Sequence, residues 1–283
     1  MTSGSSRLDV ALVERGLARS RGHAQDLVRR GVVLVNERPA VKASRSVLGS
    51  DSITVRRTDA GDPLDPRWVS RAAGKLLGAL ADLPGGGPTL QDVRAVDVGA
   101  CTGGFTQVLL ERGARHVCAV DVGHGQLAAV LRSDSRVTDL SGHNVRDLEV
   151  DTVDGPADVV VADLSFISLT MVLDRLRDLV RPGGELLLLV KPQFEVGRNG
   201  LDGRGVVRSE PDRRDALLRV LRVGYDLGLE LRGAVRSRTI GQEGNVEYVL
   251  WLRRPTEPAD LPAWQSVSQT IDRMLDRGNR EDG

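Results

Sequence analysis

Apolar and polar positions change their spacing along the chain, and the spacing predicts two different folds. From residue 93 onward, apolar runs at 93–98, 116–121, 157–163 and 185–191 are each long enough for one buried strand. Amphipathic stretches at 105–112, 127–131, 169–180 and 211–228 separate these runs or follow them. This alternation predicts helices packed on a mostly parallel, doubly wound α/β sheet. Two last strands around a turn at 241–245 are predicted to close the sheet as an antiparallel hairpin.

The first 58 residues follow another pattern. Leu8, Ala11 and Leu12 mark a short amphipathic helix, and Ser20 can cap a second helix over 21–30, which Gly31 ends. Residues 32–41 are typical of two extended pieces around a turn at 36–37, and 51–57 are typical of a last strand. We therefore expect a small α+β domain in front of the α/β domain.

Composition limits the classes of protein to which the chain can belong. A chain of 283 residues that is 40% hydrophobic can bury two cores of ordinary size. The apolar runs are too short to span a membrane, and the first residues lack the pattern of a signal peptide. Cys101 and Cys118 have no companion Cys or His at metal-ligand spacing. These features favour a cytoplasmic protein without a metal site.

Charge is unevenly distributed. Residues 7–58 contain eleven Arg and Lys against five Asp and Glu, a net charge of +6, so the rest of this neutral chain carries −6. A basic module beside an acidic domain suggests that the module meets a polyanion, although a basic segment that is merely well solvated is about as common.

The N-terminal stretch "LDVALVERGLARSRGHAQDLVRRGVVLVNERP" resembles the alpha-L RNA-binding fold, first known from small-subunit ribosomal protein S-four. It departs from that pattern at Glu37, where the turn usually has glycine. The alternative is a small helical domain that binds protein. Arginines placed in this way can contact successive phosphates of an RNA chain. Together with the resemblance, this indicates five RNA-binding candidates: Arg7, Arg19, Arg21, Arg29 and Arg30.

A stiff linker is predicted at 59–69, where Asp62, Pro63, Asp65 and Pro66 interrupt the pattern. A helix follows, with Ser70 as its possible cap. Lys75 lies inside this helix, where a lysine by itself is usually a solvated surface residue.

The strongest local motif is "AVDVGACTGGFTQVLLERG", a strand, a glycine-rich turn and a helix. Glycines let a ligand approach the backbone, and the helix start offers unpaired N–H groups. The spacing is not Gly-x-Gly-x-x-Gly, so pyrophosphate binding is less favoured. The turn instead resembles the loop of S-adenosylmethionine-dependent methyltransferases. The cofactor-binding candidates in it are Asp97, Gly99, Ala100, Cys101, Thr102, Gly103, Gly104 and Phe105.

Charged residues follow the predicted strands. Asp121 can accept the ribose hydroxyls of an adenosyl ligand, and Asn144 and Asp147 lie where the adenine would bind, although one polar residue after a strand is common. Asp163 and Lys191 end the next two strands. Ligands bind at the carboxyl ends of parallel strands, so Lys191 is better explained as a group directed into a site than as a solvent-exposed stop.

Lys75, Asp163, Lys191 and Glu247 follow one another in the order Lys-Asp-Lys-Glu. This order resembles the tetrad of FtsJ-type ribose 2′-O-methyltransferases. A ribose hydroxyl is a poor nucleophile until it is deprotonated, and a lysine can take the proton only when its pKa falls toward neutral. Lys191 is the candidate base, Asp163 would orient it, and the other two would position the ribose. Neither a metal nor a covalent intermediate is required.

At this point the chain is similar, over about residues 7–254, to the TlyA family, whose members are known as hemolysins and as ribosomal RNA 2′-O-methyltransferases. The likeness rests on "WVSRAAGKL", "DLSFISL", "LVKPQFEVGR", "GVVRSEP" and "IGQEGNVEY". It implies S-adenosylmethionine as cofactor, methylation of cytidine ribose in 16S or 23S ribosomal RNA and, in actinobacteria, an influence on susceptibility to capreomycin-type antibiotics. Ala72-Ala73 departs from the usual Gly-Gly.

The resemblance implies a Rossmann-like methyltransferase sheet with an antiparallel last strand, preceded by an α+β RNA-binding domain. The domains are predicted at 1–58 and 70–254, with a charged tail at 255–283 that could hold one short helix. Three alternatives are a cytolysin, an RNA-binding protein with an inactive methyltransferase domain, and a nicotinamide-dependent oxidoreductase. A cytolysin would need a membrane-active segment, and the oxidoreductase would need the Gly-x-Gly-x-x-Gly fingerprint; the chain has neither. An inactive methyltransferase domain would have a damaged tetrad, but all four members are present.

Overall fold

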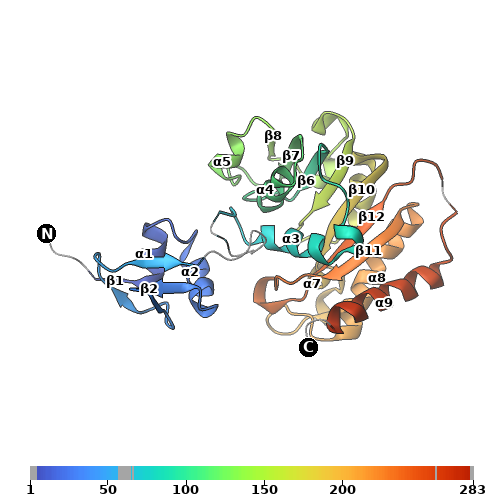
Figure 1. Cartoon of the computed structure of the whole chain (residues 1–283). Helices are drawn as coiled ribbons and strands as arrows, with labels where there is room; N and C mark the ends of the chain where they lie inside the picture. Colours follow the sequence, from blue (N-terminus) through green and yellow to red (C-terminus); the bar gives the residue numbers. More distant parts are fainter. Residues whose placement is uncertain (1–4, 57–64, 66, 259, 281–283) are drawn as a thin grey trace. The chain divides into compact units, whose positions relative to one another are not determined.

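The computed structural model describes residues 5–56, 65, 67–258 and 260–280, and the chain divides into two compact units after Gly74 (Figure 1). Most of the predicted linker, residues 59–64 and 66, lies outside the described residues. So do residues 1–4 and 57–58 of the predicted first domain and residues 259 and 281–283 of the tail.

The N-terminal unit packs two helices against short strands. Its elements are β1 (Ser6–Arg7), α1 (Leu8–Glu14), α2 (Arg21–Arg29), β2 (Val33–Val35), β3 (Arg38–Pro39), β4 (Ser46–Val47) and β5 (Ile53–Val55). β1 pairs with β4, and β3, β2 and β5 form a three-stranded antiparallel sheet. Leu8, Leu12, Leu27 and Val33 are fully or almost fully buried in its core. Ser20 caps α2 as predicted, since its hydroxyl accepts a hydrogen bond from the His23 amide.

The turn between β2 and β3 explains the departure at residue 37. Asn36 and Glu37 have φ values of 51° and 65°. Two consecutive left-handed residues make the mirror-image turn that suits a two-residue hairpin, and glycine is preferred in it. Glu37 therefore adopts a backbone conformation that residues other than glycine rarely adopt. The hairpin forms all the same, since β2 and β3 are paired.

The C-terminal unit is built on one seven-stranded sheet. Its strands are β6 (Arg94–Val98), β7 (His116–Asp121), β8 (Val137–Ser141), β9 (Ala157–Ala162), β10 (Val180–Val190), β11 (Glu230–Arg236) and β12 (Tyr248–Arg253). Their order in the sheet is β11-β12-β10-β9-β6-β7-β8. The five neighbouring strands β10, β9, β6, β7 and β8 are parallel, and β12 is antiparallel to both of its neighbours. The predicted sheet, with its antiparallel end, is confirmed. The chain reverses its direction of strand addition between β6 and β9, which creates a crevice at their carboxyl ends.

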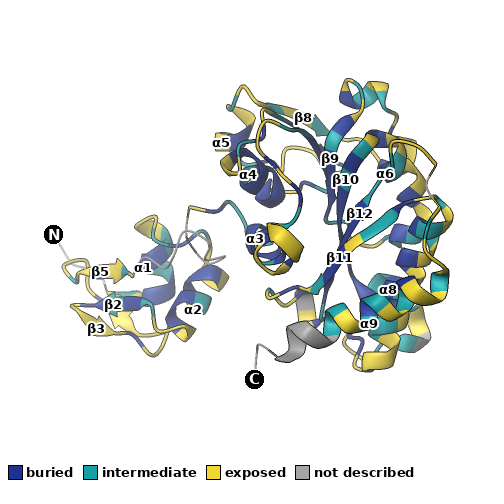
Figure 2. Cartoon of the chain, turned by 45° about the vertical axis from the view of Figure 1, so that its right-hand side comes forward, coloured by how far each residue is buried: buried dark blue, intermediate teal, exposed yellow. Residues whose placement is uncertain are grey.

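Helices cover both faces of this sheet. The α-helices are α3 (Ala72–Asp82), α4 (Gly104–Glu111), α5 (Ala129–Arg132), α6 (Leu173–Leu179), α7 (Pro192–Glu195), α8 (Glu210–Asp226) and α9 (Trp264–Arg280). Single 3-10 turns are η1 (Pro84–Gly86), η2 (Val145–Asp147), η3 (Asp151–Val153), η4 (Leu169–Met171), η5 (Arg198–Gly200) and η6 (Gln242–Gly244). Figure 2 shows the buried strands between a layer with α3 and α4 and a layer with α6, α8 and α9.

Three predicted elements differ from the structure. The helix predicted at 169–180 is interrupted at Val172, whose ψ of 1° and φ of −135° separate η4 from α6. The first strand of the predicted hairpin, expected from residue 236 up to the turn at 241–245, is instead β11, Glu230–Arg236, because this edge strand has polar residues among its apolar ones. Ser70 does not cap α3, since its buried hydroxyl has no hydrogen-bond partner among the described residues.

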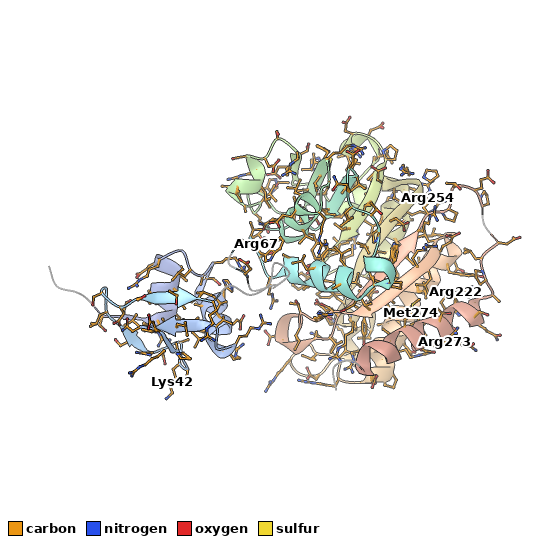
Figure 3. The ribbon with its side chains drawn as sticks, viewed as in Figure 1. Lys42, Arg67, Arg222, Arg254, Arg273 and Met274 are labelled. Atoms are coloured by element: carbon orange, nitrogen blue, oxygen red, sulfur yellow. The ribbon has the colours of Figure 1, made fainter. Side chains whose placement is uncertain are left out.

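The tail contains a long helix rather than a short one. α9 packs on β11 and α8, and its own residues Val267 and Ile271 are buried in this contact. Arg214 of α8 forms an ion pair of 2.5 Å with Asp272. Figure 3 labels Met274 and Arg273 on this helix. The tail thus completes the helical layer on one face of the sheet.

Candidate active site

The four residues of the predicted tetrad lie together in the C-terminal unit. Lys75 Nζ is 2.8 Å from Glu247 Oε2 and 3.5 Å from Asp163 Oδ2. Lys191 Nζ is 2.6 Å from Asp163 Oδ1. The two lysines and two carboxylates therefore form a continuous chain of charges, Lys191–Asp163–Lys75–Glu247, in which Asp163 bridges both cations.

The fold explains why these distant residues meet. Asp163 follows β9 and Lys191 follows β10, which are parallel neighbours, so their carboxyl ends lie at the same edge. Glu247 directly precedes β12, which runs antiparallel to β10 and therefore begins at that edge. Lys75 comes from the first turn of α3. Three strands and one helix thus contribute one side chain each.

The tetrad is shielded from water. Lys75, Lys191 and Glu247 are 5%, 7% and 2% exposed. Because opposite charges attract more strongly where water is excluded, these pairs hold their geometry better than surface ion pairs would. A Cβ at Gly241 would lie only 2.4 Å from Glu247 Oε1, so the backbone there must come close to the carboxylate.

A serine and two phenylalanines adjoin Lys191. Lys191 Nζ donates a hydrogen bond of 2.7 Å to Ser165 Oγ and lies 5.9 Å from the ring centre of Phe194. The Phe194 ring contacts Phe166 at 5.3 Å between centres. Phe166 is 88% exposed and has a left-handed φ of 65°. A large apolar ring is therefore held in solvent close to the tetrad.

The glycine-rich turn lies next to Asp163, across the crevice between β6 and β9. Gly99 has φ of 85°, and a Cβ there would be 2.7 Å from the carbonyl oxygen of Asp163. Gly103 has φ of 92° and directly precedes α4. The backbone of residues 99–104 can therefore approach a ligand that also reaches the tetrad. Cys101 is exposed, Thr102 half-buried and Phe105 buried in this segment.

Asp97 supports the turn from below. Its Oδ2 accepts hydrogen bonds from the amide and hydroxyl of Thr106, at 2.8 and 2.7 Å, which ties the strand to the first turn of α4. The side chain is fully buried, and burial raises the pKa of Asp97 to about 7 despite these two donors. Its Oδ1 has no hydrogen-bond partner among the described residues. Direct contact of Asp97 with a cofactor stays a prediction.

The three remaining cofactor candidates follow neighbouring strands. Asp121 is the last residue of β7. Its carboxylate accepts hydrogen bonds from the backbone amides of Cys101 and Gly123, both at 2.8 Å. This carboxylate therefore already faces the glycine-rich turn. Asn144 caps η2, since its Oδ1 accepts the Arg146 amide, and both Asn144 and Asp147 are exposed. These two side chains stay predictions for adenine binding.

In the N-terminal unit, Arg7 and Arg21 surround a buried acid. Arg7 donates two hydrogen bonds to Asp9, whose side chain has no exposed surface, and holds the pKa of that carboxyl well below its usual range. Arg21 lies 3.4 Å from the same carboxylate, while 60% of its side chain remains exposed. Both guanidinium groups are thus oriented by one buried anion.

The other three arginines differ in their accessibility. Arg29 is 74% exposed and pairs with Asp26 at 2.6 Å, and Arg30 is exposed beside it at the end of α2. Arg19 is half-buried and donates to the backbone carbonyls of Asp65 and Trp68, at 2.9 and 2.8 Å. Arg19 therefore holds the segment that precedes α3, and contact with RNA stays a prediction for all five.

Sequence patterns did not point to Ser165, Phe166 and Glu195 as site residues. Ser165 and Phe166 follow Asp163 within three positions, and Glu195 follows Lys191 within four. The strand-end rule that singled out Asp163 and Lys191 could have been extended to the residues just after them. Phe166 had a further signal, because the chain contains only three phenylalanines.

No helix in the part of the chain that the structure describes is long and apolar enough to cross a membrane. Among these same residues, no group of three or more His, Cys, Asp and Glu side chains is arranged to hold a metal ion.

Comparison with known proteins supports the interpretation of both units. The family model for FtsJ-like methyltransferases matches residues 68–254, and the S4 domain model matches residues 6–53. The 16S/23S rRNA (cytidine-2′-O)-methyltransferase TlyA of Mycobacterium tuberculosis is 45% identical over 96% of this chain and 98% of that protein. The 23S rRNA (cytidine-2′-O)-methyltransferase TlyA of Campylobacter jejuni is 33% identical over 83% and 95%. A solved structure of a protein named as a hemolysin from Streptococcus thermophilus is 31% identical, with a TM-score of 0.70 over 99% of both chains.

Proposed function

The chain belongs to the FtsJ-like methyltransferase family, in its TlyA branch, and from this we propose that it methylates the 2′-hydroxyl of a cytidine in ribosomal RNA, with S-adenosylmethionine as the methyl donor. The observation that carries the proposal is the tetrad. Two lysines and two carboxylates, nearly excluded from water, meet next to a glycine-rich turn at the reversal point of the sheet.

The residues around the turn fit the proposed cofactor. Backbone N–H groups of Gly103 to Phe105 lie at the start of α4, and the close approach at Gly99 leaves no space for a side chain there. The Asp121 carboxylate at the end of β7 suits two ribose hydroxyls. When bound, S-adenosylmethionine supplies an electrophilic methyl group on a sulfonium.

Lys191 is the proposed base. Its Nζ, in the neutral form, accepts the proton of the ribose 2′-hydroxyl, and the resulting ammonium is stabilised by Asp163 at 2.6 Å. Ser165 and Asp163 hold Nζ from two sides, which fixes the direction in which it faces the substrate. Lys75 neutralises Glu247 and shares Asp163, so it keeps the bridging carboxylate in place. Orientation of the reacting groups accounts for much of the expected acceleration.

The N-terminal unit and Phe166 support an RNA substrate. The basic unit matches an RNA-binding domain, and its exposed α2 arginines can neutralise phosphates. An aromatic ring exposed beside the tetrad offers a stacking surface for a nucleobase that has left its helix. The 2′-hydroxyl of a nucleotide in folded RNA can reach a buried lysine only when that nucleotide is displaced from its helix.

The test is transfer of labelled methyl groups from S-adenosylmethionine to 30S and 50S subunits from a bacterium that lacks this modification. We expect the wild type to label RNA at a cytidine 2′-oxygen. We expect Lys191→Ala to lower turnover by at least about 100-fold, because general-base catalysis contributes on that order.

Lys191→Arg is the matched control, since guanidinium keeps the charge but does not give up its proton. It should be as inactive as Lys191→Ala, while calorimetry shows cofactor affinity close to that of the wild type in both variants. Near-normal turnover in either variant would remove Lys191 from the mechanism. Absence of labelling by the wild type with both subunits would contradict the proposed substrate.

A further inference from the structure

A buried carboxylate outside the tetrad joins the two segments that carry Asp163 and Lys191. The first segment, here called the β9 loop, consists of residues 163–168, and the second is α7 (Pro192–Glu195). Glu195 accepts a hydrogen bond of 2.5 Å from Ser168 Oγ and one of 2.9 Å from the Leu169 amide. The residue is only 6% exposed. Both donors belong to the end of the β9 loop and the turn that follows it.

Burial of the Glu195 carboxylate is unfavourable by itself, and hydrogen bonds hold both its side chain and its backbone in place. Burial raises the pKa of Glu195, whereas the hydrogen bonds from Ser168 and Leu169 act in the opposite direction. The backbone of Glu195 is fixed separately, since its carbonyl accepts a hydrogen bond from Arg219 of α8. Ser168 also caps η4 by accepting the Thr170 amide at 3.1 Å. The carboxylate therefore fixes the far end of the β9 loop to α7.

The near end of the same loop carries the groups that touch Lys191. Asp163 and Ser165 both contact Lys191 Nζ, and Phe166 packs on Phe194 of α7. Gly99 limits movement of Asp163 toward the sheet, because its backbone closely approaches the Asp163 carbonyl. Displacement of the loop at Ser168 would thus be transmitted to the Lys191 contacts.

We propose that Glu195 is a positioning residue for methyl transfer, which sets the position of Asp163 and Ser165 relative to Lys191 by holding the β9 loop against α7. This role rests on the proposed function for its reaction, and on the contacts of Glu195 for its geometry. The hydrogen bonds of the Glu195 carboxylate go to Ser168 and Leu169, so it acts on the tetrad through the β9 loop.

The test compares Glu195→Leu with Glu195→Gln in the labelling assay with ribosomal subunits. Glutamine can accept from the Leu169 amide and donate to Ser168 Oγ, so it keeps both contacts, whereas leucine keeps neither. We expect Glu195→Leu to lower kcat by about 10- to 100-fold, because misplacement by about 1 Å costs on this order. KM for S-adenosylmethionine and for the subunit should stay within about twofold, and Glu195→Gln should stay within about threefold of wild-type kcat.

Ser168→Ala provides a milder variant that removes one of the two contacts and leaves the carboxylate in place. We expect it to lower kcat by about three- to tenfold, so the proposal remains testable when Glu195→Leu does not fold. Glu185 provides the matched control, since it also accepts a side-chain hydrogen bond, from Trp251 Nε1 at 2.8 Å, but in the middle of β10. Glu185→Leu should lower the melting temperature and leave kcat within about twofold.

Crystal structures of the wild type and Glu195→Leu separate this proposal from the proposed function. We expect a longer distance between Lys191 Nζ and the Asp163 carboxylate in the variant. Should the wild type methylate neither subunit, the proposed function fails and this distance still decides the positioning role. An unchanged distance, an unchanged kcat in Glu195→Leu, or a rise in KM alone would overturn the proposal.

Discussion

At the scale of single residues, Asp97 couples the stability of the C-terminal unit to pH. A carboxyl group with a pKa of about 7 in the folded protein and about 4 in the unfolded chain binds its proton more tightly when folded. Its stabilising contribution is therefore complete below about pH 4 and is lost as the pH rises toward 7. Well above pH 7 the carboxyl is ionised in both the folded and the unfolded protein, so its contribution to the unfolding free energy no longer depends on pH.

Asp97→Asn should remove this dependence. Between pH 5 and pH 8 we expect the wild type to lose about 2–3 kcal/mol more unfolding free energy than the variant, since a tenfold difference in proton affinity is about 1.4 kcal/mol. Urea unfolding of both proteins at the two pH values measures the difference, because contributions of other groups cancel in it. Parallel pH dependence of wild type and variant would mean that Asp97 is charged throughout this range.

At the scale of elements, the glycine-rich turn depends on its contact with the segment that precedes and forms α5. A Cβ at Gly103 would lie 2.2 Å from Leu131 Cδ1 and 2.8 Å from Leu127 Cδ1. Both leucines are buried, so they have little room to withdraw. We expect Gly103→Ala to lower the unfolding free energy by about 1–3 kcal/mol, the usual cost of overpacking. We also expect at least a tenfold loss of S-adenosylmethionine affinity in calorimetry.

Gly155→Ala is the control for backbone strain alone. Gly155 has a left-handed φ of 98°, and its added Cβ would meet nothing within 4 Å. It should cost about 1 kcal/mol of stability and leave cofactor affinity unchanged. Equal effects of the two substitutions on cofactor affinity would show that crowding against the leucines does not shape the turn.

The parallel strands and the tetrad could be predicted from the sequence because they follow a local rule. A short apolar run that ends in a charged residue marks the carboxyl end of a strand, and parallel strands bring those ends together, as Asp163 and Lys191 show. Glu247 was harder, since it directly precedes the antiparallel strand β12, and the resemblance to known tetrads was needed to select it. The assignment of all four to catalysis stays a prediction.

Other features depend on tertiary contacts that no local pattern reveals. α9 was expected to be short because its stretch is mostly polar, but Val267 and Ile271 find an apolar surface on the sheet. β11 was misplaced because it is an edge strand with polar residues on it. Glu195 could not be recognised as buried, since its two donors come from a loop 26 and 27 residues earlier in the chain.

At the scale of the whole molecule, charge separates the two parts of the chain. Residues 7–58 carry +6 and the rest carries −6. The acidic part contains the tetrad, so electrostatics alone would keep RNA away from it. We therefore expect the N-terminal unit to supply the electrostatic attraction for RNA, and the C-terminal unit to supply the chemistry.

Salt dependence tests this division. Arg21→Gln with Arg29→Gln removes two exposed charges of α2 without placing new acids beside Asp9 and Asp26. We expect the slope of log affinity for ribosomal RNA against log salt to become shallower by about 1.4–1.8, since each phosphate contact contributes about 0.7–0.9. Affinity for S-adenosylmethionine should not change.

The matched control is Arg222→Gln with Arg273→Gln, which removes two charges from the surface of α8 and α9 (Figure 3). Net charge falls equally in both double variants, so any difference between their slopes reports where RNA makes contact. A shallower slope only for the α2 variant would locate the phosphate contacts in the N-terminal unit. Equal slopes would mean that RNA responds to total charge, and α2 would then have no special part in docking.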